Sequence, residues 1–350
     1  MNNLQNVFCK QDTFRVIKAR VLRFTTHVSR LPHISLLTVA LWPALSQAQD
    51  KAEQFPSRPI RIMGGGVGST ADFLSRFIAQ KLNEKWGQPV VVDSRAGAGG
   101  TIATDIVAKA APDGYTMVMG HAGTHVSAVS LYKDLPYDPV KDFEPITRMT
   151  SGVTVLVTHT SLPISNAREL VAYVKQKGAL SYGSAGNGTI SHLTGELFNQ
   201  VAGVKLQHVP YKSAGFALTA LLGNEVPVSF LSPITANTQL RAGRVKALAV
   251  SGKERFPSVP DIPSTVEAGL SGMEAELWFG LFTTAKTPRA VVQKINREVV
   301  DVLSRPDVRE LILKQGALVR PGTPEELGAY VREELKRWTP IIKAAGVKAG

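Results

Sequence analysis

The chain has 350 residues, of which 44% are hydrophobic and 19% are charged. This length predicts about two domains, and the composition is typical of a globular protein, which excludes an intrinsically disordered chain. The formal net charge is +12, but the first 48 residues alone carry +5, so about +7 remains on the rest. The remaining Lys and Arg residues are scattered along helical stretches with few aromatic residues between them, so we expect no nucleic-acid partner.

The first 48 residues have the pattern of a secretory signal peptide. A basic segment precedes the short apolar run Ile34–Leu45, and the small-x-small triplet Ser46-Gln47-Ala48 follows it. Cleavage at this triplet predicts a mature periplasmic protein that begins near Gln49. Cys9 is the only cysteine and lies inside the segment. The mature chain would therefore have no disulfide, no catalytic thiolate and no lipid-modified N-terminal cysteine.

The stretch Ile60–Arg76 predicts a strand, a bare turn and a helix in succession. Ile60–Met63 has the pattern of a short buried strand, Gly64–Gly68 is rich in glycine, and Ser69, Thr70 and Asp72 are residues typical of a helix start. Glycines let backbone N–H groups approach a ligand, and the first turn of a helix leaves donors unpaired at the positive end of its dipole. The pattern indicates an anion-binding loop; the alternative is an ordinary connection between a strand and a helix.

Two further strands are predicted at Gln88–Asp93 and Tyr115–Gly120. Between them lie a second glycine-rich loop, Ser94–Gly100, and a helix that extends to Ala110. This alternation of strands and helices predicts a parallel sheet with helices on both faces. Ligands of such sheets bind at the carboxyl ends of the strands, which is where these loops fall.

A long extended segment at Pro145–His159 predicts a crossing into a second lobe, and another at Leu277–Thr284 predicts the return. Between them, the strand Leu180–Gly183 leads into a third glycine-rich loop, Ser184–Thr189, and a helix from Ser191 to Val201. The other predicted elements are helices at Ala167–Lys177, Ala217–Leu222, Pro288–Leu303 and Pro324–Ala345, and strands at Leu206–Val209, Val226–Leu231 and Val245–Val250.

Some motifs have a competing chemical interpretation. Gly66-x-Gly68-x-x-Ala71 matches the dinucleotide-binding fingerprint, and Asp93 follows at the distance of a ribose-binding acid, so a Rossmann-type oxidoreductase is the alternative function. His121 and His125 are four residues apart, but no cysteine or suitably spaced acid completes a metal site, so we expect no metal. The P-loop lysine and the Gly-x-Ser-x-Gly elbow are absent, and we therefore expect a protein that is not an enzyme.

Several segments are specific when taken together: RAGAGGTIAT, APDGYT, LPYDPVKDFEP, LSYGSAGNGTISHL, HVPYKSAG, WFGLF and the late GTPEEL. Through them the chain resembles, from about Phe55 to Gly346, the Bug receptors, which are the periplasmic substrate-binding proteins of tripartite tricarboxylate transporters. The resemblance implies an α/β, two-lobed periplasmic-binding-protein fold (type II, Venus flytrap) with lobes at 49–150 plus 280–350 and at 151–279. It also implies a small organic carboxylate as ligand, membrane transporter subunits as partners, no cofactor and a monomer.

In that family the ligand carboxylate is held by the first strand–helix loop and by a second-lobe Ser-x-Gly-x-Gly loop, which correspond here to Val67–Asp72 and Ser184–Thr189. The ligand-binding residues that the resemblance implies are Gly68, Ser69, Thr70, Asp72, Ala122, Thr124, Ser184, Gly186, Asn187, Gly188, Thr189 and His192. We expect Asp72 to brace the first loop by capping its backbone, because a carboxylate repels an anionic ligand.

The first loop departs from the family pattern. Relatives usually have Pro-Phe-x-Pro-Gly-Gly where this chain has Gly64-Gly65-Gly66-Val67-Gly68-Ser69. Without the prolines we expect a more mobile loop, and without the aromatic ring a different pocket wall. Leu231 stands where many relatives have an Asp able to pair with a ligand amine, and this change disfavours an amino-acid ligand.

Overall fold

The computed structural model describes residues 54–178, 180–344 and 346, and all of them belong to one folded unit. The signal peptide that we predict at residues 1–48 lies outside the described residues. Within the described part of the chain, no helix combines the length and the apolar composition that a membrane span requires.

The first sheet is mixed, with parallel strands at one edge and antiparallel strands at the other. Its six described strands lie in the order β11 (Leu318–Val319), β4 (Phe143–Val153), β10 (Glu276–Thr284), β3 (Thr116–His121), β1 (Ile60–Gly64) and β2 (Val90–Ser94). The pairs β3–β1 and β1–β2 are parallel, as the alternation of strands and helices predicts. Their carboxyl ends therefore carry the first two glycine-rich loops to one edge of the sheet.

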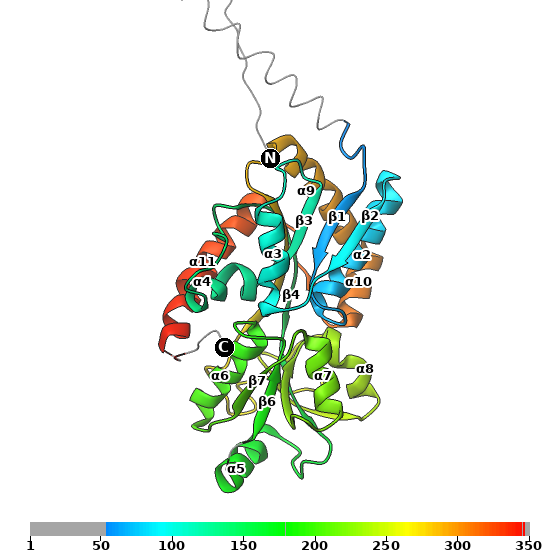
Figure 1. Ribbon diagram of the computed structural model, residues 1–350. Coiled ribbons are helices and arrows are strands. Elements are labelled where there is room, and N and C mark those ends of the chain that lie inside the picture. The colour runs from blue at the N-terminus through cyan, green and yellow to red at the C-terminus, as the bar shows by residue number, and fades with distance from the viewer. Residues whose placement is uncertain (1–53, 179, 345, 347–350) are drawn as a thin grey trace, which may run out of the picture. The chain divides into compact units, whose positions relative to one another are not determined.

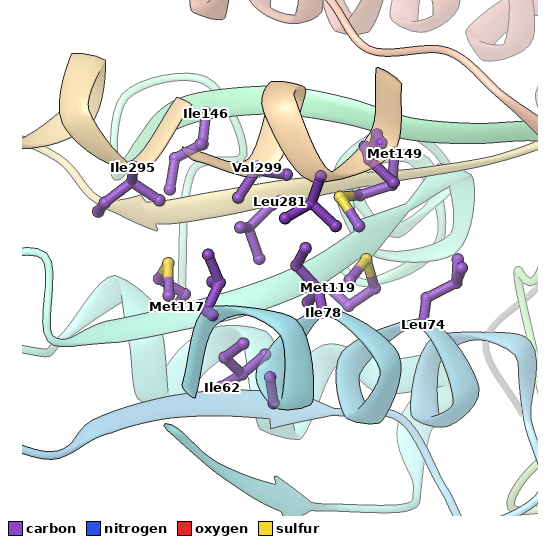
Figure 2. Packing of buried hydrophobic residues seen from close by; sticks show 14 of the residues in the cluster. Ile62, Leu74, Ile78, Met117, Met119, Ile146, Met149, Leu281, Ile295 and Val299 are labelled. Atoms are coloured by element: carbon purple, nitrogen blue, oxygen red, sulfur yellow. The ribbon is translucent and has the colours of Figure 1, made fainter. Parts of the chain in front are cut away.

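Helices cover both faces of this sheet. Leu74 and Ile78 of α2 (Thr70–Trp86) and Ile295 and Val299 of α9 (Arg289–Ser304) pack against one face, together with α10 (Pro306–Gln315). Figure 2 shows these side chains pointing toward the methionine and leucine side chains of the sheet. The opposite face packs against α3 (Thr101–Ala108), the short helical segments η2 (Gly123–Ser127) and α4 (Ala128–Leu131), and α11 (Pro324–Ala344).

The second sheet is also mixed, and helices also cover both of its faces. Its five described strands lie in the order β7 (Gln207–Pro210), β6 (Ser181–Ser184), β8 (Val228–Leu231), β5 (Val155–His159) and β9 (Val245–Val250). One face packs against α5 (Ala167–Lys177) and α6 (Ile190–Ala202), and the other against α7 (Ala214–Leu222) and α8 (Pro233–Arg241). Figure 1 shows α5 to α8 with β6 and β7 in green and yellow-green.

The chain crosses between the sheets at two places. Strand β4 belongs to the first sheet and β5 to the second, with only Thr154 between them. The chain returns through residues 251–275, and β10 then pairs antiparallel with β4 from Glu276 opposite Val153 to Thr284 opposite Phe143. The predicted extended segment at Pro145–His159 is therefore two strands in two sheets, whereas Leu277–Thr284 lies wholly in the first sheet.

The sequence does not predict helices α8 and α10, strand β11 or the short helical segments η1 (Ala98–Gly100), η2 and α4. Helix α8 begins at a serine–proline pair, Ser232-Pro233, and α10 begins at Pro306; proline is common at the first position of a helix, so both starts carry a local signal. Strand β11 has only two residues. Such a short strand depends on its partner β4 and not on any pattern of its own sequence.

Candidate functional site

A cavity of about 90 Å³ lies among the loops that follow the strands of both sheets. It is several times the roughly 10–15 Å³ that holds one water, and far below the about 300–1,000 Å³ of pockets for drug-sized molecules. Its lining comes from both sheets' loops: Gly65, Gly66, Ser69, Thr70, Ala71, Arg95, Gly97, Gly99, Gly100, His121, Ala185, Thr189, Ile190, Ser191, Lys212, Ser213, Ala214, Ser232, Leu277 and Phe279. The cavity suits a small molecule.

Five helices begin at this cavity. The residues that flank their first turns, the N-caps of α2, α3, α6, α7 and α8, all line it: Ser69, Gly100, Thr189, Ser213 and Ser232. Each helix directs the positive end of its dipole and its unpaired N–H groups toward the capping position. Several such ends around one space create a positive potential without any charged side chain.

The α2 terminus shows how the sequence builds one of these ends. Strand β1 stops at Gly64, the chain turns, and the Ser69 hydroxyl accepts a hydrogen bond from the Asp72 N–H at 3.2 Å. This cap satisfies the third N–H of the helix. The N–H groups of Thr70 and Ala71, the first two helical residues, have no partner within the described residues, and both residues line the cavity.

The α6 terminus faces the same cavity from the second sheet. Thr189 is its N-cap but gives no side-chain cap, and its hydroxyl donates to the Gly186 carbonyl at 2.7 Å. The next two N–H groups belong to Ile190 and Ser191, which line the cavity and have no backbone acceptor in the described chain. Each lobe thus supplies two N–H groups without an acceptor, and all four belong to residues that line the same cavity.

The charged side chains at the cavity are basic. Arg95 and Lys212 line it, and no acidic residue of the described chain does so. Arg95 donates to Asp93 at 2.9 Å, and Asp93 also pairs with Arg61. Hydrogen bonds from Arg61 and then Arg95 lower the pKa of Asp93. Lys212 is exposed and has no ion-pair partner among the described residues.

The predicted site residues do not all reach the cavity. Of the twelve, Ser69, Thr70 and Thr189 line it. Gly68 instead meets Gly215 of the other lobe: a Cβ added at Gly68 would lie 3.4 Å from the Gly215 Cα. The Asp72 carboxylate accepts from the Ser94 hydroxyl at 2.6 Å and pairs with Arg76 at 3.1 Å. The prediction that Asp72 caps the backbone of the first loop is therefore wrong, because the Ser69 hydroxyl is the cap.

The second-lobe loop uses most of its polar groups inside the protein. The Ser184 hydroxyl is fully buried, lies 2.6 Å from the His208 Nε2 and accepts from the Gly186 N–H at 3.1 Å. The Gly188 N–H donates to His192 Nδ1 at 3.1 Å, and its carbonyl accepts from the Ser127 hydroxyl of the first lobe. These groups fix the loop and do not line the cavity.

Four other predicted residues lie behind the cavity wall. The Asn187 carbonyl lies against Gly99, where an added Cβ would stand 2.6 Å from that oxygen. Ala122 and Thr124 are buried, and the Thr124 hydroxyl bonds the backbone of His121 at 3.1 Å. His192 is also buried; burial, and then the neighbouring His208, lower its pKa to about 3, so it is a neutral acceptor.

Sequence reasoning missed the residues at the helix starts themselves, Ala71, Ile190 and Ser191, and the wall formed by His121 and Phe279. The helix-start residues directly follow predicted strands and loops, so the local signal was present. The wall depends on the pairing of β3 with β10, which no local pattern reveals. Within the described residues, no group of three or more His, Cys, Asp or Glu side chains could hold a metal ion.

The fold and the cavity define a two-lobed solute-binding protein, and comparison with known proteins gives the family. The family model described as tripartite tricarboxylate transporter family receptor matches residues 74–347. A UPF0065 protein of Bordetella pertussis is 35% identical over 317 residues, which cover 89% of this chain and 97% of the relative.

Two solved structures are similar over nearly their whole length. R. palustris Rpa4515 with adipate has a TM-score of 0.82 and 32% identity, covering 84% of this chain and 99% of that chain. The periplasmic binding protein BugD has a TM-score of 0.80 and 35% identity, covering 84% and 100%. The chain belongs to the tripartite tricarboxylate transporter receptor family, and the predicted Bug-type, two-lobed fold is confirmed. It is a periplasmic transport receptor and not an enzyme, so the Rossmann-type oxidoreductase is excluded.

Proposed function

We propose that this receptor captures a small organic carboxylate between its two lobes. One observation carries the proposal: the N-caps of five helices, from both lobes, surround a cavity that no acidic side chain of the described residues lines. Helix N-termini bind anions through backbone N–H groups and the helix dipole. The adipate bound to the similar protein Rpa4515 supports a carboxylate as the anion.

In this proposal the α2 and α6 termini clamp the ligand carboxylate. The N–H groups of Thr70 and Ala71 donate from the first lobe, and those of Ile190 and Ser191 donate from the second. Ser69 and Thr189 stand beside them at the cavity. The remaining predicted residues, Gly68, Ser184, Gly186, Asn187 and Gly188 among them, act by holding the two loops in shape. Each charge-assisted hydrogen bond is worth about 1.5–3 kcal/mol.

The proposal includes the route and partners of the receptor. Residues 1–48 direct export and are removed, and the mature monomer delivers its ligand to the membrane subunits of a tripartite tricarboxylate transporter. The two lobes are built on the two sheets, so their boundaries fall near Thr154 and within residues 251–275, a few residues from the 150/151 and 279/280 boundaries that the resemblance implies, and the lobes close about these crossing segments. Intact-mass measurement of periplasmic extract tests the cleavage: a mature chain that starts far from Gln49 would contradict it.

A thermal-shift screen tests the function. The mature protein is titrated with mono-, di- and tricarboxylates, with sulfate, and with NAD⁺ as a matched negative control. We expect at least one carboxylate to raise the melting temperature by mass action, with a concentration dependence that gives a dissociation constant, and no shift with NAD⁺. If no carboxylate shifts the melting temperature at millimolar concentration, the proposed ligand class is wrong.

A further inference from the structure

One wall of the cavity is a pair of rings on neighbouring strands. His121 is the last residue of β3 and lies directly opposite Phe279 of β10 in the antiparallel register. Residues directly opposite each other place their side chains on the same face of a sheet. The two ring centres are 5.7 Å apart at an interplanar angle of 61°, and both residues line the cavity.

Hydrogen bonding determines which nitrogen of His121 carries the proton. The Gly123 N–H donates to His121 Nδ1 at 3.0 Å, so Nδ1 is an acceptor and a neutral imidazole has its hydrogen on Nε2. Nε2 lies against Gly100, a cavity-lining residue at which an added Cβ would stand 3.1 Å from this nitrogen. Within the described residues, Nε2 has no hydrogen-bond partner.

The imidazole of His121 that carries this N–H is neutral. Burial lowers the pKa of His121 to about 4, so the ring is uncharged at neutral pH. The rest of this wall is apolar, with Leu277 and Phe279 beside the imidazole. The wall therefore offers one neutral N–H in an apolar surface. The cavity offers no carboxylate to neutralise an ammonium group, since no Asp or Glu of the described chain lines it.

We propose that His121 is a specificity-determining residue, which donates its Nε2 hydrogen to an oxygen on the body of the ligand, beyond the anchored carboxylate. The ligand class is then a small carboxylate that carries a hydroxyl or keto oxygen and no amino group. This inference rests on the proposed function, because the clamp must first hold a carboxylate for His121 to read the rest of the molecule.

Matched acids that differ at one position test the inference. The first set is succinate, malate and aspartate, and the second is propionate, lactate and alanine; within each set the variable group is hydrogen, hydroxyl or ammonium. Calorimetry with the mature wild-type protein should give the hydroxy acid about tenfold tighter binding than its unsubstituted partner, the size of one well-formed hydrogen bond to a neutral group. The amino acid should bind weakest.

Three variants separate the donor from its structural role. In His121→Asn the side-chain oxygen replaces Nδ1, so the Gly123 N–H keeps an acceptor while the donor at Nε2 is lost. In His121→Gln the amide nitrogen replaces Nε2 and restores a donor. His159→Asn is the matched control, because His159 lies outside the cavity, where its ring bonds Ser161. Thermal unfolding without ligand verifies that each variant folds.

The expected result is that His121→Asn binds malate no better than succinate, whereas His121→Gln and His159→Asn keep the preference for malate. If the acids bind wild type but hydroxy and unsubstituted partners bind alike, or His121→Asn keeps a tenfold preference, the assignment of His121 is overturned and the carboxylate clamp stands. If none of the six acids binds wild type although a carboxylate of the wider screen does, the inferred ligand class is overturned and the carboxylate clamp stands. If no carboxylate binds at all, both proposals are overturned.

Discussion

The hydroxyl groups of Thr70 and Ser232 lie 2.6 Å apart and join the two lobes directly beside the cavity. Thr70 is the first residue of α2, and Ser232 is the N-cap of α8. Both residues are buried. The same hydroxyls that line the cavity thus also connect the lobes, so closure and ligand binding share a contact.

Replacing Thr70 by Val should favour the open arrangement of the lobes. The change keeps the side-chain volume and removes the interlobe hydrogen bond, which is worth about 0.5–1.5 kcal/mol, so the ratio of closed to open molecules should fall by roughly two- to tenfold. Small-angle scattering should report a larger radius of gyration than for wild type. Thr219→Val is the control, because the Thr219 hydroxyl bonds within α7 at Gly215. An unchanged scattering curve for Thr70→Val would show that the hydrogen bond between Thr70 and Ser232 does not contribute to closure of the lobes.

Gly188 permits a close approach of the lobes, and its replacement should lower stability. Its φ is +74°, and an added Cβ would stand 2.3 Å from the Leu131 Cδ1 of the first lobe. Gly203 has a similar φ of +60° but nothing within 4 Å of the added atom. Gly203→Ala should cost about 1–2 kcal/mol of unfolding free energy through the backbone alone. Gly188→Ala should cost roughly 1–3 kcal/mol more through overpacking.

Urea unfolding of both variants measures this difference. Equal losses of unfolding free energy would mean that Leu131 moves aside freely and that the approach of the loop to the first lobe has little energetic weight. A larger loss for Gly188→Ala accompanied by weaker carboxylate binding would link the packing of this loop to the clamp.

The elements that were predicted from sequence are those whose start, end and type are determined by neighbouring residues in the chain. The strand, glycine turn and helix start at Ile60–Arg76 are contiguous in the chain, and helix α5 was predicted with the bounds it has because Asn166 caps it and Gly178 ends it. Missed elements had weak local periodicity, as in α8, or depended on a distant strand, as in β11.

The site was predicted less completely for a physical reason. The glycine loops were found, but a loop N–H is available to a ligand only if the protein does not use it. The Gly188 N–H is bonded to His192 and the Gly186 N–H to Ser184. Those partners follow from the packed position of each side chain, and a glycine pattern alone does not contain them. The unpaired donors lie instead one to two residues inside the helices.

Buried histidines should make the protein sensitive to mild acid. Burial, and then His121, lower the pKa of His125 to about 3, and His125 stacks on Phe282 with ring centres 4.0 Å apart. The unfolded pKa is about 6.5. Below that pH the unfolded chain binds a proton that the folded chain does not. The free energy of unfolding therefore falls as pH decreases from about 6.5 toward 3, by about 1.4 kcal/mol per pH unit for each such histidine.

His125→Phe isolates one of these contributions, because the replacement retains an aromatic ring against Phe282. Urea unfolding between pH 4 and 8 should show a slope smaller by about 1.4 kcal/mol per pH unit than wild type between about pH 6 and 4. Above pH 7 the difference between the two proteins should not depend on pH. A wild-type slope in the variant below pH 6 would show that His125 takes up its proton equally in both states.

Lys212 should attract the ligand without anchoring it. The side chain is exposed at the cavity, so its charge acts through solvent and weakens with salt over a Debye length of about 8 Å at physiological ionic strength. Lys212→Met should weaken succinate binding by roughly two- to fivefold at low salt, within the about 0.2–1 kcal/mol typical of exposed charge pairs. Above about 0.5 M salt the difference should vanish.

Lys205→Met is the matched control, since Lys205 is also exposed on the second lobe but does not line the cavity. Calorimetry at several salt concentrations should give this control wild-type affinity throughout. A loss far above fivefold for Lys212→Met that persists at high salt would mean that the ammonium group contacts the carboxylate directly. In that case the backbone donors of α2 and α6 would share the anchoring role with a side chain, and the affinity of the site would no longer follow from its helix N-termini alone.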